Sequence, residues 1–119
     1  MLTYCQDDGA LFLDEVKLCT GYSGKGAGRN NPALEAMPNI GPIPKGLWSI
    51  DHPPYDDPHK GKLVFRLHPV GHDAHGRSGF LIHGDSGEHP GQASEGCVIL
   101  PRLIRQQIAS EKLTELEVI

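Results

Sequence analysis

Two short segments carry the residue types that nucleophilic catalysis needs. The apolar run 80–83 ends in His83, and Ser94-Glu95-Gly96-Cys97 precedes a second apolar run. A cysteine attacks as its thiolate, so it needs an imidazole to hold the proton and backbone amides to receive the oxyanion. Gly96 lacks a side chain and lets a substrate approach Cys97. The pattern indicates a cysteine nucleophile with a histidine base, although most free cysteines are inert core residues and Cys97 has that alternative interpretation.

The elements that must position these residues are short β-strands. The chain has 119 residues with 15 Gly and 10 Pro, which favours many turns in a single domain over long helices. Residues 47–50, 63–67, 80–83, 96–100 and 113–119 have the apolar character of strands. Pro101 suits the first turn of a helix, in which Ile104 and Ile108 face the core. The sequence therefore predicts a mainly β domain with one short helix after Cys97.

The first 20 residues predict a hairpin with a tight turn at Asp8-Gly9, which would place Cys5 opposite Phe12. Two further segments predict irregular structure. The glycine-rich stretch 21–31 is typical of a flexible surface loop, and Tyr55-Asp56-Asp57 is typical of a turn among prolines.

Composition excludes several functional classes. The net charge is −4 without a Lys/Arg cluster, so nucleic-acid binding is not expected. No apolar run approaches the ~20 residues that span a bilayer, so no membrane insertion is expected. The first residues have neither the basic nor the apolar segment of a signal peptide, which predicts synthesis in the cytoplasm. Three cysteines, an odd number, cannot form a fully paired disulfide framework.

The residues around His83 and Cys97 resemble the signature of the L,D-transpeptidase (YkuD-like) catalytic domain, in which a histidine precedes Ser-His-Gly-Cys on a β-sandwich. The resemblance is closer to small antibacterial effectors of type VI secretion that are L,D-transpeptidase-like. It extends to Asn31-Pro32, the double-proline turn 41–46 and Trp48, and covers roughly residues 20–119. It implies one catalytic domain over residues 1–119, a compact β-sandwich with one short helix after the cysteine, and neither a cofactor nor a metal.

The resemblance also implies roles for individual residues. Cys97 matches the nucleophile and His83 its base, while Gly84 matches the position whose backbone carbonyl orients the histidine. Ser94 matches the Ser of the signature and would support the turn or bind substrate. Gly96 and Cys97 would supply amides to the oxyanion hole.

The sequence departs from the family pattern at two positions. Glu95 replaces the second histidine of the signature, and residues 98–100 lack the arginine that commonly follows the cysteine in larger relatives. Arg102 or Arg105 would supply a positive charge for the substrate carboxylate instead. Asp85 would orient the histidine or bind a substrate amine, with a solvated loop acid as an equal alternative.

The implied reaction is acyl transfer on peptidoglycan stem peptides. Cys97 would attack the amide between the L-centre of meso-diaminopimelate and D-Ala, and would form a thioester. Water would resolve it as an L,D-carboxypeptidase, and a D-amino acid as an exchange transpeptidase. The resemblance further implies secretion into a target-cell periplasm, with a cognate immunity protein and the secretion apparatus as candidate partners.

Two alternatives stay open at the level of sequence. Seven histidines, including His72-x-x-His75 and His83-x-Asp85, could serve a metal-dependent cell-wall peptidase. A non-catalytic peptidoglycan-binding protein could stack sugars on Trp48, Tyr55 and Tyr22, although scattered aromatic residues are more often core or rim residues. A papain-like peptidase is disfavoured because His83 precedes Cys97 in the chain.

Overall fold

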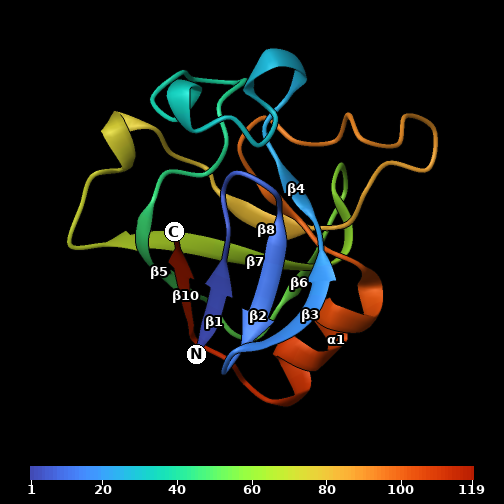
Figure 1. Ribbon diagram of the computed structural model, residues 1–119. Coiled ribbons are helices and arrows are strands. Elements are labelled where there is room, and N and C mark those ends of the chain that lie inside the picture. The colour runs from blue at the N-terminus through green and yellow to red at the C-terminus, as the bar shows by residue number, and fades with distance from the viewer.

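The computed structural model describes all residues, 1–119, as a mainly β fold with one α-helix (Figure 1). The strands of the first half are β1 (Leu2–Tyr4), β2 (Ala10–Leu13), β3 (Val16–Thr20), β4 (Tyr22–Ser23) and β5 (Gly46–Ile50). Those of the second half are β6 (Tyr55–Asp57), β7 (Gly61–Val70), β8 (Leu81–His83), β9 (Val98–Ile99) and β10 (Glu115–Val118). Three 3-10 turns, η1 (Gly26–Gly28), η2 (Pro32–Leu34) and η3 (Ala74–Gly76), lie in the loops, and α1 spans Arg102–Ser110. The predicted fold class is confirmed.

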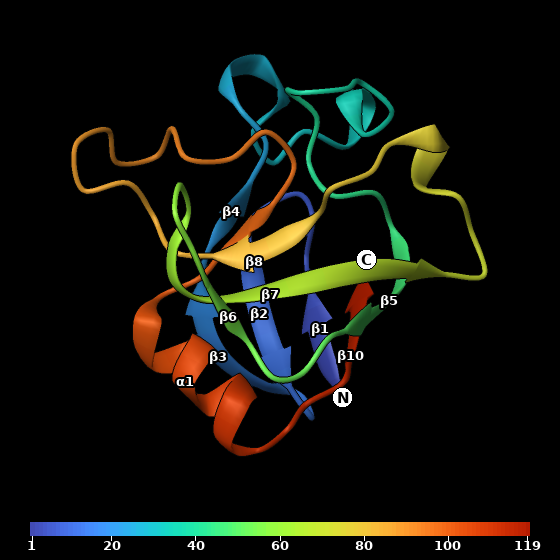
Figure 2. The ribbon, with the colours of Figure 1, turned by 180° about the vertical axis from the view of Figure 1, so that it is seen from behind.

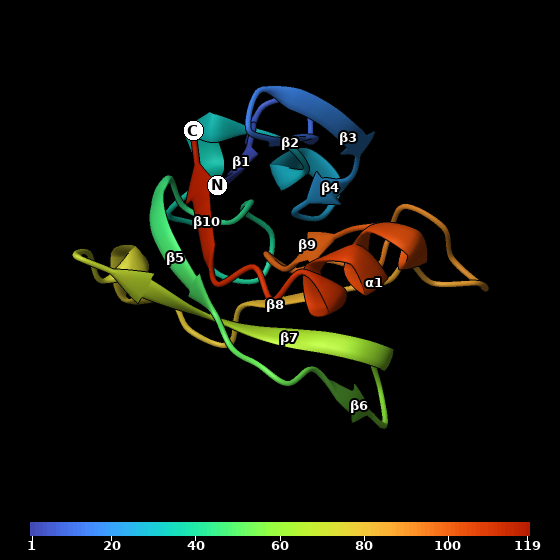
Figure 3. The same ribbon diagram turned by 90° about the horizontal axis from the view of Figure 1, so that it is seen from below.

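The strands form one mixed sheet in the order β3-β2-β1-β10-β5-β7-β8-β9-β4, with β6 paired to β7. The pairs β1–β10 and β8–β9 are parallel, and the other pairs are antiparallel. The two ends of this order are adjacent in the chain, because only Gly21 separates β3 from β4, so the sheet curls round on itself (Figure 3). The two facing layers of the expected sandwich therefore belong to one continuous, curled sheet.

The hydrophobic core fills the space inside this curl. Trp48 from β5, Phe65 from β7 and Ile82 from β8 are fully buried in it, together with Leu2 and Tyr4 from β1. Period-two alternation explains this, since inward residues of each strand are apolar while their neighbours face outward. The Trp48 Nε1–H donates to the Pro44 carbonyl at 3.0 Å, so the predicted double-proline turn is attached to the core.

The helix follows the chemistry-bearing segment directly, as predicted. Pro101 precedes α1, and Ile108 is fully buried while Ile104 is partly buried against the core. α1 packs beside the start of β7 (Figures 2 and 3). Neither α1 nor any 3-10 turn has the length and apolar character needed to cross a membrane.

Three local predictions were wrong. The first hairpin has the longer loop Gln6–Gly9, so Thr3 rather than Cys5 pairs with Phe12, and a second tight turn at Asp14-Glu15 begins β3. Both turn residues have positive φ, 48° and 75°, which is the geometry of a hairpin turn that usually selects Gly or Asn.

Tyr55–Asp57 forms the strand β6 rather than a turn, because it pairs with the long strand β7. The glycine-rich segment is not simply a surface loop. Its residues Tyr22 and Ser23 form β4, which is buried and paired with β9. This pairing connects the segment to the region of Cys97.

Candidate active site

His83 is held rigidly at the end of β8. Its side chain is 1% exposed, and its Nδ1 lies 2.8 Å from the Gly84 carbonyl oxygen. A carbonyl can only accept, so Nδ1 must carry the proton and the neutral ring has its lone pair on Nε2. Nε2 is buried and has no hydrogen-bond partner. An imidazole in this state is suited to accept a proton, and Gly84 has the orienting contact implied by the sequence resemblance.

Cys97 lies immediately before β9, and β9 pairs with β8, the strand that ends at His83. The parallel register pairs Ile82 with Val98 and His83 with Ile99, and the first pair faces the core. Because side chains alternate along a strand, Cys97 and His83 lie on the other face, as diagonal neighbours across the two strands. The Cys97 Sγ lies 3.9 Å from the Gly79 carbonyl oxygen. The tertiary structure thus brings the two residues to one face, with the sulfur directed to a carbonyl rather than bonded to the ring.

Burial sets the charge state of this pair. Desolvation lowers the pKa of His83 below its usual 6.5, and the nearby positive charges of Lys60 and Arg105 act in the same direction. Desolvation raises the pKa of Cys97 above its usual 9, although a hydrogen bond from the Leu81 N–H and the charge of Lys60 oppose it. At neutral pH the resting state is therefore a neutral thiol beside a neutral imidazole. The thiolate would form as His83 takes the proton during attack.

The two residues line adjoining cavities of a groove. Cys97 lines a cavity of about 420 Å³ with Arg77, Gly79 and Leu81, and His83 lines one of about 450 Å³ with Asp85. Lys60 and Glu95 line both cavities and so mark their junction. Cys97 and His83 therefore border two neighbouring cavities that meet at Lys60 and Glu95, while Nε2 of the imidazole stays buried behind the surface of the groove.

A buried hydroxyl holds the segment that carries Cys97. Ser94 is 0% exposed; its Oγ donates to the Cys97 carbonyl at 2.6 Å and accepts from the amides of Gly24 at 2.9 Å and Gly96 at 3.1 Å. From β4, the Ser23 Oγ donates to the Gly96 carbonyl at 2.9 Å. All these bonds go to backbone groups, so Ser94 supports the turn, which is the first of the two roles that the resemblance implied.

The two amides predicted for the oxyanion hole differ in availability. The Gly96 N–H is engaged by Ser94, whereas the Cys97 N–H precedes the β9 ladder and takes part in none of the backbone bonds outside it. Gly96 has φ +139°, and a Cβ there would lie 2.5 Å from Arg77 and 3.0 Å from Phe80. Gly96 is needed because a side chain at this position would clash with Arg77 and Phe80. The Cys97 amide is therefore the group that is free to receive an oxyanion.

The predicted arginines do not face the nucleophile. Arg102 is exposed on the first turn of α1 and lines neither cavity. Arg105 is buried, and it donates to the carbonyls of Leu100 (3.1 Å), Lys62 (2.7 Å) and Leu63 (3.2 Å). Its guanidinium also lies against Gly84, where a Cβ would come within 2.5 Å of Nη2. Arg105 therefore supports the peptide that orients the histidine.

Asp85 organises the loop after His83 and does not contact the imidazole. Its Oδ1 accepts from the Tyr22 hydroxyl at 2.6 Å and the Ser86 amide at 2.8 Å, and both its oxygens are 3.1 Å from the Gly91 amide. Burial and the bond to this carboxylate raise the pKa of Tyr22 to about 12. The orientation of His83, one of the roles considered for Asp85, belongs to Gly84 instead.

Arg77 is a site residue that sequence reasoning missed. Its Nη1 donates to the carbonyls of Glu35 (2.7 Å) and Pro42 (2.8 Å), and its Nη2 to those of Gly41 (3.0 Å) and Glu95 (3.1 Å). The guanidinium thereby joins the double-proline turn to the segment before Cys97. No local pattern marks this arginine, because its four partners come from three separate parts of the chain.

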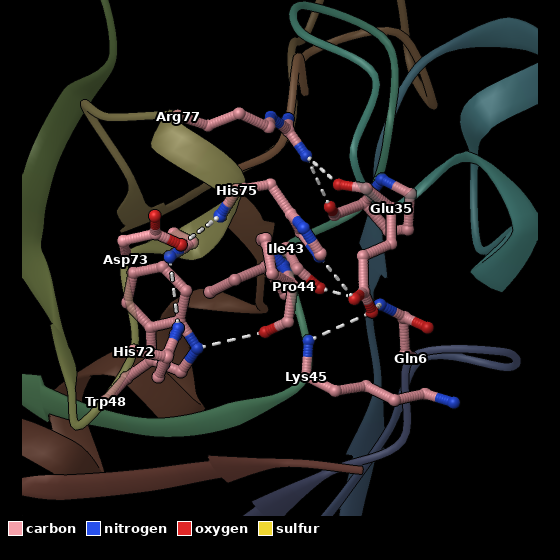
Figure 4. A network of polar contacts seen from close by, with 12 residues as sticks. Gln6, Glu35, Ile43, Pro44, Lys45, Trp48, His72, Asp73, His75 and Arg77 are labelled. Atoms are coloured by element: carbon pink, nitrogen blue, oxygen red, sulfur yellow. Dashed lines mark hydrogen bonds and ion pairs between the residues drawn. The ribbon is translucent and has the colours of Figure 1, made fainter.

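A polar network continues this wall of the groove (Figure 4). The Glu35 carboxylate accepts from Gln6 at 2.7 Å, from the Lys45 amide at 3.1 Å and pairs with His75 Nε2 at 2.7 Å. His75 lines the Cys97 cavity, so the histidine-containing loop 72–77 does border the site. The network fixes η2, η3 and the β1–β2 loop against one another.

The residues considered for the two alternatives have other roles. Both nitrogens of His72 are used: Nε2 contacts the Leu47 carbonyl at 3.0 Å and Nδ1 accepts from the Ala74 amide at 3.2 Å. No three or more His, Cys, Asp or Glu residues gather as metal ligands. Trp48 and Tyr22 are buried, so neither offers its ring to a sugar, and the guanidinium of Arg66 lies 4.0 Å from the centre of the Tyr55 ring.

Comparison with known proteins identifies the family of this chain. The family model described as the Tlde1 domain matches residues 17–119, from β3 to the C-terminus, and includes every site residue above except Gln6. No curated protein matches the chain. The chain therefore belongs to the Tlde1 domain family, a type VI secretion effector family of L,D-transpeptidase-like character.

Proposed function

We propose that this protein is a peptidoglycan-modifying cysteine enzyme that acts on stem tetrapeptides. It removes D-Ala from the L-centre of meso-diaminopimelate as an L,D-carboxypeptidase, exchanges that D-Ala for another D-amino acid as an L,D-transpeptidase, or does both. As an antibacterial effector it would act in the periplasm of a target cell, where this substrate lies. The family supports this choice of substrate class, and the residues of the site support this type of reaction.

One observation carries the proposal: the bond between His83 Nδ1 and the Gly84 carbonyl leaves Nε2 as the proton acceptor on the face of the sheet that bears Cys97. A general base must have the correct tautomer and orientation, and hydrogen bonds at the site of a free enzyme often tighten only when substrate binds. β8 and β9 hold His83 and the segment of Cys97 in this arrangement, because each of the two strands is paired with a neighbour on both sides.

The chemistry follows from these positions. As the Cys97 sulfur bonds to the scissile carbonyl carbon, its proton passes to His83 Nε2 and the oxyanion faces the Cys97 N–H. When the C–N bond breaks, His83 returns the proton to the departing amine of D-Ala, and a thioester remains. Water, or the amine of a D-amino acid, then gives a proton to Nε2 and attacks the thioester. The C–S bond breaks, the stem peptide leaves, and the proton on Nε2 returns to the Cys97 sulfur.

The test is to incubate the purified chain with disaccharide tetrapeptide, with and without D-Met, and to follow the masses of the products. We expect loss of D-Ala, exchange for D-Met, or both, and no product from Cys97→Ala or His83→Ala. Cys19→Ala and His68→Ala are matched controls, since both residues lie outside the two cavities. Unchanged masses with the folded wild-type chain would refute the proposal. A chelator that abolishes turnover while Cys97→Ala keeps it would favour the metal-dependent alternative.

A further inference from the structure

Lys60 occupies a special position in the groove. It lies in the turn between β6 and β7, where its backbone amide donates to Asp57 Oδ1 at 2.9 Å. Its side chain is exposed and lines both the Cys97 cavity and the His83 cavity. A charge at this junction acts on both catalytic groups, and Lys60 lowers the pKa of each.

The other permanent cations near the site are already engaged or lie elsewhere. The four hydrogen bonds of Arg77 and the three of Arg105 all go to backbone carbonyls of the fold. Arg102 lines neither cavity. Lys60 is thus the one lysine or arginine of the groove whose charged group makes no bond within the protein.

The Lys60 charge is also unpaired. The ion pairs of the structure are Met1–Asp14, His68–Asp51 and His75–Glu35, and Glu95 forms none with Lys60 although both line the same two cavities. Asp85, which lines the His83 cavity, is not paired with Lys60 either. A cation whose charged group has no bonded counter-ion gains a charge-assisted hydrogen bond when an anionic ligand arrives.

We propose that Lys60 binds the terminal carboxylate of the D-amino acid that leaves, or enters, at the scissile amide. The inference rests on the proposed function, and it names the residue that selects for a free carboxylate one residue beyond the bond that is cut. Attack by an incoming D-amino acid is the reverse of departure of the outgoing one, so one subsite serves both. Substrates that lack this carboxylate lose the contact.

The experiment compares two substrates on two variants. The substrates are the disaccharide tetrapeptide with a free D-Ala carboxylate and the same molecule with a D-Ala carboxamide. The variants are Lys60→Met and the matched control Lys62→Met, whose exposed side chain lies two residues away on β7 and lines neither cavity. We expect the wild type and Lys62→Met to prefer the carboxylate about tenfold in kcat/KM, which is the range of an exposed charge-assisted bond. Lys60→Met loses this preference, and Lys60→Arg retains it.

A second measurement separates this inference from the proposed function. Calorimetric titration of Cys97→Ala with the two peptides reports binding without turnover. If Cys97→Ala binds the carboxylate peptide more tightly than the carboxamide and Cys97→Ala/Lys60→Met does not, the subsite is supported. This result would stand even if the wild type released no D-Ala and the proposed function failed. An equal preference with Lys60 and with Met at this position, in both assays, overturns the inference and leaves the proposed function intact.

Discussion

The Ser94 hydroxyl lies 2.6 Å from the carbonyl oxygen of Cys97, three residues along the chain, and this contact fixes the backbone from which the proposed nucleophile projects. Ser94 touches no solvent, so in the proposed reaction it would act through the position of Cys97. This segment lies at the end of the long orange loop that follows β8 in Figure 1.

Replacement of Ser94 by Ala should reduce both stability and turnover. The change removes one buried bond and leaves the amides of Gly24 and Gly96 without their acceptor, which costs about 2–3 kcal/mol of the free energy of unfolding. We expect a lower kcat with little change in KM, measured beside urea unfolding. Ser110→Ala, at the exposed last residue of α1, should leave both quantities near the wild-type values, and equal effects of the two changes would contradict the role given to Ser94.

The pH dependence of kcat/KM should report the burial of His83. Protonation of Nε2 removes the base, and desolvation disfavours the charged ring, so activity should fall only when the pH drops below the usual histidine value of 6.5. Lys60 and Arg105 push the pKa of His83 in the same direction, while Asp57 and the Gly84 carbonyl oppose them. Lys60→Met should move the acid limb to higher pH. An acid limb above pH 6.5 in the wild type would show that the ring is not desolvated as described.

Gly84 and Gly87 form a matched pair in the loop after β8. An Ala Cβ at position 84 would meet the Arg105 guanidinium at 2.5 Å, whereas one at position 87 has nothing within 4 Å. Because Arg105 is buried and bonded to three carbonyls, Gly84→Ala should cost about 1–3 kcal/mol in stability and tilt the carbonyl that orients His83. Thermal unfolding and tetrapeptide turnover should be lowered together, with Gly87→Ala unaffected. Wild-type behaviour of Gly84→Ala would mean that Arg105 moves aside freely.

Arg77 and Arg102 should behave in opposite ways. Lysine cannot reproduce the planar fork with which Arg77 binds four carbonyls, so Arg77→Lys should lower the free energy of unfolding by about 2–3 kcal/mol and reduce turnover. Arg102→Lys and Arg102→Met should be near neutral, because that side chain is exposed outside the groove. The measurement is urea unfolding with tetrapeptide turnover on the same samples. A large loss of activity in Arg102→Met would restore it as a substrate-binding residue.

The sequence by itself determined the mainly β class, the helix after Pro101 and the candidate pair His83 and Cys97. These features are local: an apolar run predicts a strand, a proline marks the first turn of a helix, and His-Gly followed by Ser-x-Gly-Cys is a short motif. The contact between the Gly84 carbonyl and His83 is local as well, because Gly84 directly follows His83 in the chain.

Only the tertiary structure decided what surrounds this pair. The parallel pairing of β8 with β9 sets which face Cys97 shares with His83, and register is a long-range property. Arg77 and Tyr22 became site residues because folding brought carbonyls and a carboxylate from distant segments to them, and Lys60 because two cavities meet at its side chain. Charge state depends likewise on burial, which shifts the pKa of the thiol and of the imidazole in opposite directions and is invisible in a linear sequence.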